Sequence, residues 1–280
     1  MLKPKIVIVA SEQDIASKNI GHKILELGHF KKVERIAPYP TYQEGNNYFV
    51  WHDKKLVEED VTDLDTYFQP ELYLFVFRHL GKGLSRLTVH PVGNFTLPKP
   101  DSKVPYRGLP HHIAYTNPAY MKEALKFMHH LNQERNLNYS VSYEVTHHTP
   151  TELKAPVMFL EIGDTEVNHN DEKAIVAVAE TALHLLNTTP PSCTNCIAIG
   201  GDHYAERFTR RALNGEYGFG HFIAGYALPD VTPEVLEQAI NKTVGGVKFA
   251  IIDSKTVGQE QKPLLSLLES KGIDVIKLPK

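Results

Sequence analysis

The sequence predicts an α/β fold in which a mixed, largely parallel sheet is covered by helices. Short apolar runs typical of buried strands alternate along the chain with segments of helical periodicity. Several of these runs end in polar loops that carry histidine, and ligands of such sheets bind beyond the carboxyl ends of the strands. The 280 residues, 42% of them hydrophobic, can bury a large core. We therefore expect a single catalytic domain over residues 1–280.

In the first half of the chain, the apolar run Lys5–Ala10 predicts the first strand. Ser17–Leu27 has apolar residues at helical spacing, and Gly28 predicts the end of this helix. The runs Leu72–Phe77 and Leu87–Val89 predict two further strands, the first of them buried on both faces.

A proline-rich segment over residues 91–118 interrupts this pattern. It contains six prolines and little periodicity, which predicts a long ordered loop inserted in the domain, and such loops are often functional. Asn117 predicts the N-cap of the next helix, with Pro118 at its first position and an end near Arg135. The later elements are strands at Tyr139–Val145, Val157–Ile162, Cys196–Ile199, Lys248–Asp253 and Asp274–Leu278, and helices at Glu172–Leu186, at Pro233–Asn241 with Thr232 or Asp230 as cap, and at Pro263–Ser270.

Composition excludes several classes of protein. The net charge of -3 excludes a uniformly basic nucleic-acid coat, although a local basic patch is compatible with it. With only two cysteines, the chain has no disulfide framework of the kind found in small secreted proteins. The apolar run near the N-terminus is too short for a signal peptide, and no apolar segment is long enough to cross a membrane. We expect a cytoplasmic protein.

Fifteen histidines are a high number for this length, and the informative ones follow predicted strands. They occur in Arg78-His79, His90, His147-His148 and Gly201-Asp202-His203-Tyr204. Imidazole binds metals and transfers protons near neutral pH, so this placement predicts an enzyme with a histidine-lined site. Glu161 lies inside an apolar strand, where a carboxylate needs an imidazole or a metal as partner. The alternative for Glu161 is an edge strand that turns it to solvent.

Four other segments have two readings each. Gly200-Gly201 follows a strand, and such a turn either exposes backbone N–H groups to a ligand or simply connects a strand to a helix. Gly218–His221 is either a glycine-loosened binding loop or a flexible connection. Glu206–Arg211 predicts either a phosphate contact or a solvated helix face. Cys193–Cys196 is a weak zinc signal, and a buried thiol pair or a disulfide explains it equally well.

Taken in chain order, these segments resemble the archaeal and plant type of D-aminoacyl-tRNA deacylase. The matching segments are Arg78-His79, Leu87–Asn94 (LTVHPVGN), Glu144–Thr151 (EVTHHTPT), Glu161–Glu166 (EIGDTE), Gly200–Thr209 (GGDHYAERFT) and Gly220-His221. They extend over nearly the whole chain, and their order makes them more specific than any one alone. Thr149 departs from the family pattern, which has glycine there, and we expect it to narrow the pocket or to alter the turn.

The resemblance implies a phosphorylase/hydrolase-like fold and hydrolysis of the ester bond between a D-amino acid and tRNA, with water attack assisted by histidine and zinc. The catalytic candidates are His147, His148, His203 and Asp202. The metal candidates are His148, Glu161, His203 and His221. The substrate-binding candidates are Arg78, His79, His90, Asn94, Gly200, Gly201, Tyr204, Arg207 and Arg210, where the glycine N–H groups would stabilise an oxyanion and the arginines would contact the tRNA. Which histidine binds metal and which acts as base stays open.

Two other classes of function fit the residues. One is a metal-dependent peptidase or nucleoside phosphorylase-like enzyme on a related fold. The other is a non-catalytic RNA-binding protein, against which the net charge of -3 and the dense imidazole–carboxylate clusters argue. The expected partner is tRNA charged with a D-amino acid. We expect no membrane association and no obligatory protein partner.

Overall fold

A computed structural model describes residues 1–34, 36, 38–81, 83–97, 108–257 and 262–279. Its largest element is an eight-stranded sheet with the strand order β2-β3-β4-β1-β5-β10-β6-β9. The strands are β1 (Ile6–Ser11), β2 (Lys31–Lys32), β3 (Thr41–Glu44), β4 (Asn47–His52), β5 (Leu72–Arg78), β6 (Arg86–His90), β9 (Ser140–Tyr143) and β10 (Val157–Gly163). β4, β1, β5 and β10 run parallel, whereas β6 is antiparallel to β10. The prediction of a mixed, largely parallel sheet is therefore confirmed.

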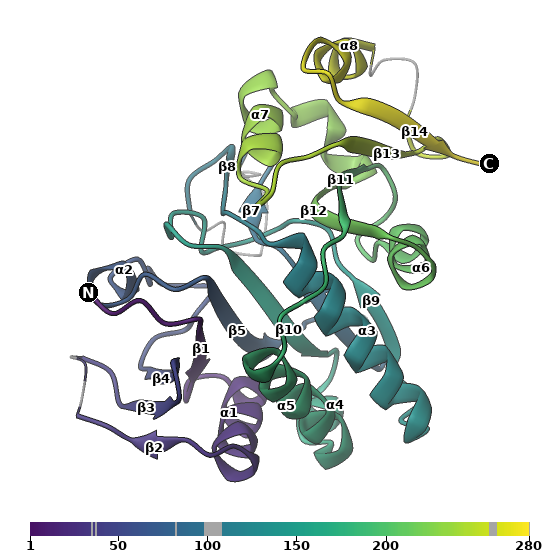
Figure 1. The fold of residues 1–280 in the computed structure, drawn as a ribbon. Coiled ribbons are helices and arrows are strands. Elements are labelled where there is room, and N and C mark those ends of the chain that lie inside the picture. The colour runs from purple at the N-terminus through teal and green to yellow at the C-terminus, as the bar shows by residue number, and fades with distance from the viewer. Residues whose placement is uncertain (35, 37, 82, 98–107, 258–261, 280) are drawn as a thin grey trace.

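A second sheet lies beyond the first along the chain (Figure 1). It has the order β12-β11-β13-β14, and all its neighbouring strands pair in parallel. Its strands are β11 (Thr194–Ile199), β12 (Tyr217–Ile223), β13 (Phe249–Asp253) and β14 (Asp274–Leu278). A short antiparallel pair, β7 (Gly93–Asn94) and β8 (His112–Ile113), lies within the proline-rich segment 91–118, which therefore contains two short strands as well as loop. Residues 98–107 of that segment lie outside the described residues.

The described helices are α1 (Ile15–Leu27), α2 (Leu64–Tyr67), α3 (Pro118–Glu134), α4 (Glu166–His169), α5 (Glu172–Asn187), α6 (Glu206–Asn214), α7 (Pro233–Asn241), α8 (Lys262–Ser270) and a 3-10 turn at Gly225–Asp230. Two predicted N-caps are confirmed. The side chain of Asn117 accepts from the Ala119 N–H, and that of Thr232 accepts from the Val235 N–H, which settles the cap of α7. Among the residues that the structure describes, no helix is both long and apolar enough to cross a membrane.

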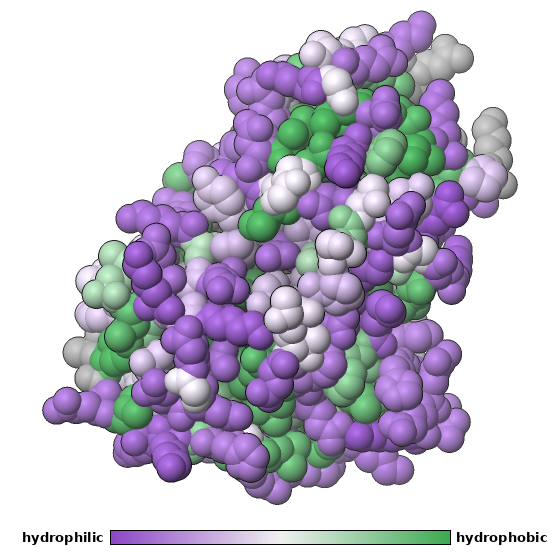
Figure 2. Space-filling model, viewed as in Figure 1, coloured by the Kyte–Doolittle hydropathy of each residue, from purple (hydrophilic) through white to green (hydrophobic). Residues whose placement is uncertain are grey.

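Alternating residues of β1 serve two cores on the two faces of the large sheet. Ile6, Ile8 and Ala10 join the core beneath α1, α3 and α5, which Figure 1 shows side by side across one face. Val7 and Val9 point into the opposite core, which lies beneath α2 and neighbouring loops. The first core continues into the second sheet. Figure 2 shows a mostly hydrophilic face whose broadest apolar area lies where Figure 1 draws this second sheet.

One sequence reading is wrong. Gly218–His221 is neither a binding loop nor a flexible connection, because it forms the buried centre of β12. Glycine is needed here for space: a Cβ atom at Gly218 would collide with Cys193 Sγ, and one at Gly220 would collide with the Thr243 hydroxyl. The two cysteines are free, and neither belongs to a group of potential metal ligands among the described residues.

Candidate active site

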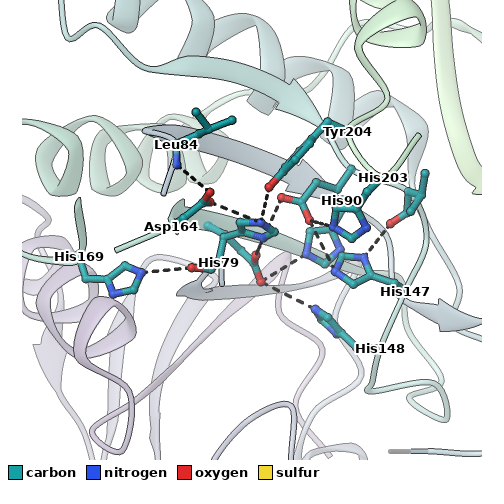
Figure 3. A network of polar contacts seen from close by, with 12 residues as sticks. His79, Leu84, His90, His147, His148, Asp164, His169, His203 and Tyr204 are labelled. Atoms are coloured by element: carbon teal, nitrogen blue, oxygen red, sulfur yellow. Dashed lines mark hydrogen bonds and ion pairs between the residues drawn. The ribbon is translucent and has the colours of Figure 1, made fainter. Parts of the chain in front are cut away.

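Five histidines converge around two buried glutamates at one edge of the large sheet (Figure 3). His79 directly follows β5, and Glu161 lies near the end of its neighbour β10. β6 runs antiparallel to β10, so its last residue, His90, pairs with Phe159 and comes close to Glu161. The remaining members come from the turn after β9 and from the loop between β11 and α6, and they are Glu144, His147, His148 and His203.

Glu161 is the hub of one half of this cluster. Its Oε1 lies 3.3 Å from His90 Nε2 and 3.8 Å from His148 Nε2, and its Oε2 lies 3.4 Å from His79 Nδ1. Burial raises the pKa of this carboxyl, but His90 and the other imidazoles outweigh burial and hold the pKa well below its usual range. The buried carboxylate predicted from the strand pattern therefore has the histidine partners that it requires.

Glu144 is the hub of the other half. Its Oε1 lies 3.1 Å from His79 Nδ1, and its Oε2 lies 3.2 Å from His203 Nε2 and 3.5 Å from His147 Nε2. Here too burial raises the pKa of the carboxyl, and hydrogen bonds from His203 and His79 lower it well below the usual range. Sequence reasoning missed this role, although Glu144 immediately precedes the double-histidine turn.

His79 connects the two halves. Burial alone lowers its pKa, but the Glu144 and Glu161 carboxylates outweigh burial and raise the pKa to about 11. Its Nε2 lies 2.8 Å from the Tyr204 hydroxyl. The Arg86 guanidinium lies 3.5 Å above the Tyr204 ring, a stacking contact that the sequence did not reveal. His79 is thus a buried cation between the carboxylates of Glu144 and Glu161, and its Nε2 also lies 3.5 Å from Asp164 Oδ1.

Three imidazoles are oriented alike by backbone carbonyls. Nδ1 of His90 lies 3.1 Å from the Pro91 oxygen, Nδ1 of His147 lies 2.8 Å from the Val145 oxygen, and Nδ1 of His148 lies 2.6 Å from the Thr149 oxygen. When Nδ1–H donates to a carbonyl, Nε2 is left with its lone pair toward the cluster, as metal-binding histidines require. Burial lowers the pKa of both His147 and His148, which favours the neutral form that ligates metals.

These histidines form groups that could hold a metal ion. His90, His147 and His148 offer ligand atoms that all lie within 4.8 Å of one another, and so do His79, Glu144 and His203. His90, Glu144 and Glu161 form a third such group. His90 Nε2 is buried without a well-formed hydrogen bond among the described residues. A cation at the cluster would satisfy this atom.

Several predicted site residues do not contribute to the cluster. His221 is buried in β12 with its Nδ1 3.2 Å from the Thr146 hydroxyl, and it belongs to none of the metal-ligand groups among the described residues. Asp202 is exposed to solvent. The N–H of Gly200 donates to the Ile223 carbonyl at 2.8 Å, and that of Gly201 donates to the Thr256 hydroxyl at 2.6 Å. Neither glycine therefore has an N–H left for an oxyanion.

The predicted basic residues are also tied elsewhere. Arg207 pairs with Asp253 and donates to the Pro279 carbonyl, and Arg210 is exposed on α6. Arg78 directly precedes His79 of the cluster, and its Nε lies 2.9 Å from Asp14 Oδ2. Asn94 is buried in β7 and donates to the Leu109 carbonyl at 3.3 Å.

Comparison with known proteins gives a consistent result. The family model described as D-aminoacyl-tRNA deacylase matches residues 66–276. A protein of Pyrococcus horikoshii with that name is 33% identical over 97% of this chain and 99% of its own length. One of Methanosarcina barkeri with the same name is 34% identical over 98% of this chain and 90% of its own. A crystal structure described as a conserved protein of unknown function superposes with a TM-score of 0.89 at 30% identity, covering 99% of this chain and 96% of that one.

Proposed function

The chain belongs to the D-aminoacyl-tRNA deacylase family, and we propose that it hydrolyses the ester bond between a D-amino acid and tRNA. The observation that carries this proposal is the cluster of five histidines around two buried carboxylates. Aminoacyl esters are activated, so a positioned base and an electrophile suffice to accelerate water attack. The products would be the free D-amino acid and uncharged tRNA.

We propose zinc as the cofactor, held by His90, His147 and His148. Three histidine ligands with one open position are typical of catalytic zinc sites. The carbonyl contacts of the three Nδ1 atoms leave each Nε2 with its lone pair, and one ligand atom of each ring lies within 4.8 Å of the others, which fits this metal. When bound, zinc supplies a Lewis acid that activates water and polarises the ester carbonyl. Glu161, a predicted ligand, contacts two of the three rings and would compensate the positive charge.

His203 is the general base that the geometry favours. With its Nε2–H donated to Glu144 Oε2 at 3.2 Å, the unprotonated nitrogen is Nδ1, which lies 3.4 Å from the Tyr226 hydroxyl. The ring is 33% exposed, so substrate and water can reach it. Nδ1 takes a proton from the attacking water, and Glu144 stabilises the imidazolium that forms. His79 keeps Glu144 in position through its contact with Oε1.

Two variants separate these roles. His148→Ala should lose bound zinc and deacylation together, whereas His203→Ala should keep zinc and lose only deacylation. His130→Ala, on the exposed side of α3, is the matched control and should change neither. Zinc content is measured on purified protein, and deacylation is measured on D-tyrosyl-tRNA. Near-normal rates in both variants would refute the assignment, and full activity in metal-free protein would refute the zinc part.

A further inference from the structure

A buried guanidinium near the histidine cluster has no role in the chemistry proposed above. Arg86 begins β6, where it pairs with Gly163 of β10 and Ser140 of β9, and it is only 7% exposed. Its Nε and Nη1 make no hydrogen bond among the described residues, and the Glu206 carboxylate, 3.9 Å from Nη1, belongs to a side chain that is 56% exposed. A buried charge is costly when its ion pair is this weak. Another kind of contact must therefore account for Arg86.

That contact is with the ring of Tyr204. The guanidinium carbon of Arg86 lies 3.5 Å from the ring centroid, which is a close cation–π stack. The backbone of this segment is held independently, because the Ala205 N–H donates to the Tyr143 carbonyl at 3.0 Å and Tyr204 forms a bridge with Glu144. These backbone bonds do not fix the rotation of the Tyr204 side chain. The planar guanidinium fixes the ring, and with it the position of the hydroxyl.

The Tyr204 hydroxyl contacts the imidazole that joins the two halves of the cluster (Figure 3). It lies 2.8 Å from His79 Nε2, whereas Asp164 Oδ1 lies 3.5 Å from the same nitrogen. On the other side of the imidazole, Nδ1 lies 3.1 Å from Glu144 Oε1 and 3.4 Å from Glu161 Oε2. Without the hydroxyl, the Asp164 charge would draw Nε2 toward itself, and Nδ1 would move away from the two glutamates.

We propose that Arg86 and Tyr204 act together as positioning residues for His79. The guanidinium holds the phenol ring, and the phenol hydroxyl holds the imidazole. The imidazole in turn holds Glu144, the partner of the general base His203. The proposal rests on the proposed function. It gives Tyr204 a role without substrate contact, in place of the substrate-binding role expected from the sequence.

Two variants test the proposal, each with a matched control. Tyr204→Phe keeps the ring and removes the hydroxyl, while Arg86→Met keeps an aliphatic side chain and removes the stacking cation. Each should lower kcat on D-tyrosyl-tRNA roughly tenfold, the effect of one hydrogen bond to a charged group, with KM and zinc content unchanged. Arg211 and Tyr217 form a similar pair between α6 and β12, with the guanidinium carbon 5.6 Å from the ring centroid, and neither belongs to the cluster. Tyr217→Phe and Arg211→Met should therefore keep the wild-type kcat.

The double variant tests whether the two residues act as one unit. Because Arg86 is proposed to act only through the Tyr204 hydroxyl, combining Tyr204→Phe with Arg86→Met should lower kcat no further than the more impaired single variant. Multiplied losses would overturn the proposal, and so would a wild-type kcat in Tyr204→Phe. A raised KM with unchanged kcat in Tyr204→Phe would also overturn it, because Tyr204 would then contact substrate. If urea melts show that Arg86→Met is unfolded, Arg86→Lys replaces it, since lysine keeps the charge without the planar stack.

A second readout does not depend on turnover. In protein with isotope-labelled histidine, the NMR resonance of His79 Nε2, assigned by its loss in His79→Gln, reports on the contact with the Tyr204 hydroxyl. It should shift in Tyr204→Phe and in Arg86→Met but not in Tyr217→Phe, and an unshifted resonance in either of the first two overturns the proposal. Failure of the wild-type protein to hydrolyse any D-aminoacyl-tRNA, with these shifts present, instead overturns the proposed function.

Discussion

Acid should destabilise the fold through His221, and the size of the effect can be worked out from its surroundings. His221 is fully buried in β12 near the Lys242 ammonium. Burial, with Lys242 acting in the same direction, lowers its pKa to about 3. The unfolded chain binds a proton near pH 6.5 and the folded chain does not, so stability falls as pH decreases from 6.5 toward 3. At pH 5 the loss is roughly 2 kcal/mol, since each pH unit below 6.5 costs about 1.4 kcal/mol.

The assay is urea unfolding of the wild type and of His221→Asn at pH 7 and pH 5. Asparagine retains a polar atom near the position of Nδ1, which contacts the Thr146 hydroxyl. Other titrating groups are common to both proteins, so their effect cancels. We expect the wild type to be more stable at pH 7 and this advantage to shrink by roughly 2 kcal/mol at pH 5. A stability difference between the two proteins that is the same at pH 7 and pH 5 would show that His221 does not become protonated on unfolding, and circular dichroism verifies that both proteins are folded at pH 5.

Two further predictions concern packing and the carboxylate hub. Gly220→Ala should lower the free energy of unfolding by roughly 1–3 kcal/mol in urea melts, because the new methyl group collides with the Thr243 hydroxyl. An unchanged urea midpoint would mean that β12 and Thr243 move apart at no cost in stability. Glu161→Gln removes the charge shared by three imidazoles, so zinc affinity should fall roughly 10- to 100-fold in competition with a chelator. Unaltered affinity would show that this carboxylate does not support the metal.

Sequence reasoning succeeded where local chemistry determines structure. The start of α3 follows from Asn117 and Pro118, and the start of α7 follows from Thr232 and Pro233, because caps depend on immediate neighbours. β12 was missed because its glycines are typical of loops when read locally. Their reason is the close approach of Cys193 and Thr243, which only the folded chain brings near.

The same distinction between local sequence and contacts made only in the folded chain explains which site residues could be predicted. Histidines that follow strands were recognised because parallel strands place their ends together, and the structure brings His79, His90, His147, His148 and His203 into one cluster. Glu144 was not expected as a hub, because its burial and its distances to three imidazoles depend on packing between distant segments. His221 shares the motif pattern of the other candidates, yet β12 places its Nδ1 against the Thr146 hydroxyl, and none of the metal-ligand groups among the described residues includes it.

Hydrolysis of D- and L-tyrosyl-tRNA by the purified, zinc-loaded protein tests the central claim most directly. Release of free tyrosine is followed for both substrates on the same tRNA, beside an enzyme-free control. We expect the D-ester to be hydrolysed roughly hundredfold or more faster than the L-ester, since a pocket shaped for one enantiomer excludes the other. Equal rates for the two esters, or a rate for the D-ester no faster than the enzyme-free control, would contradict it.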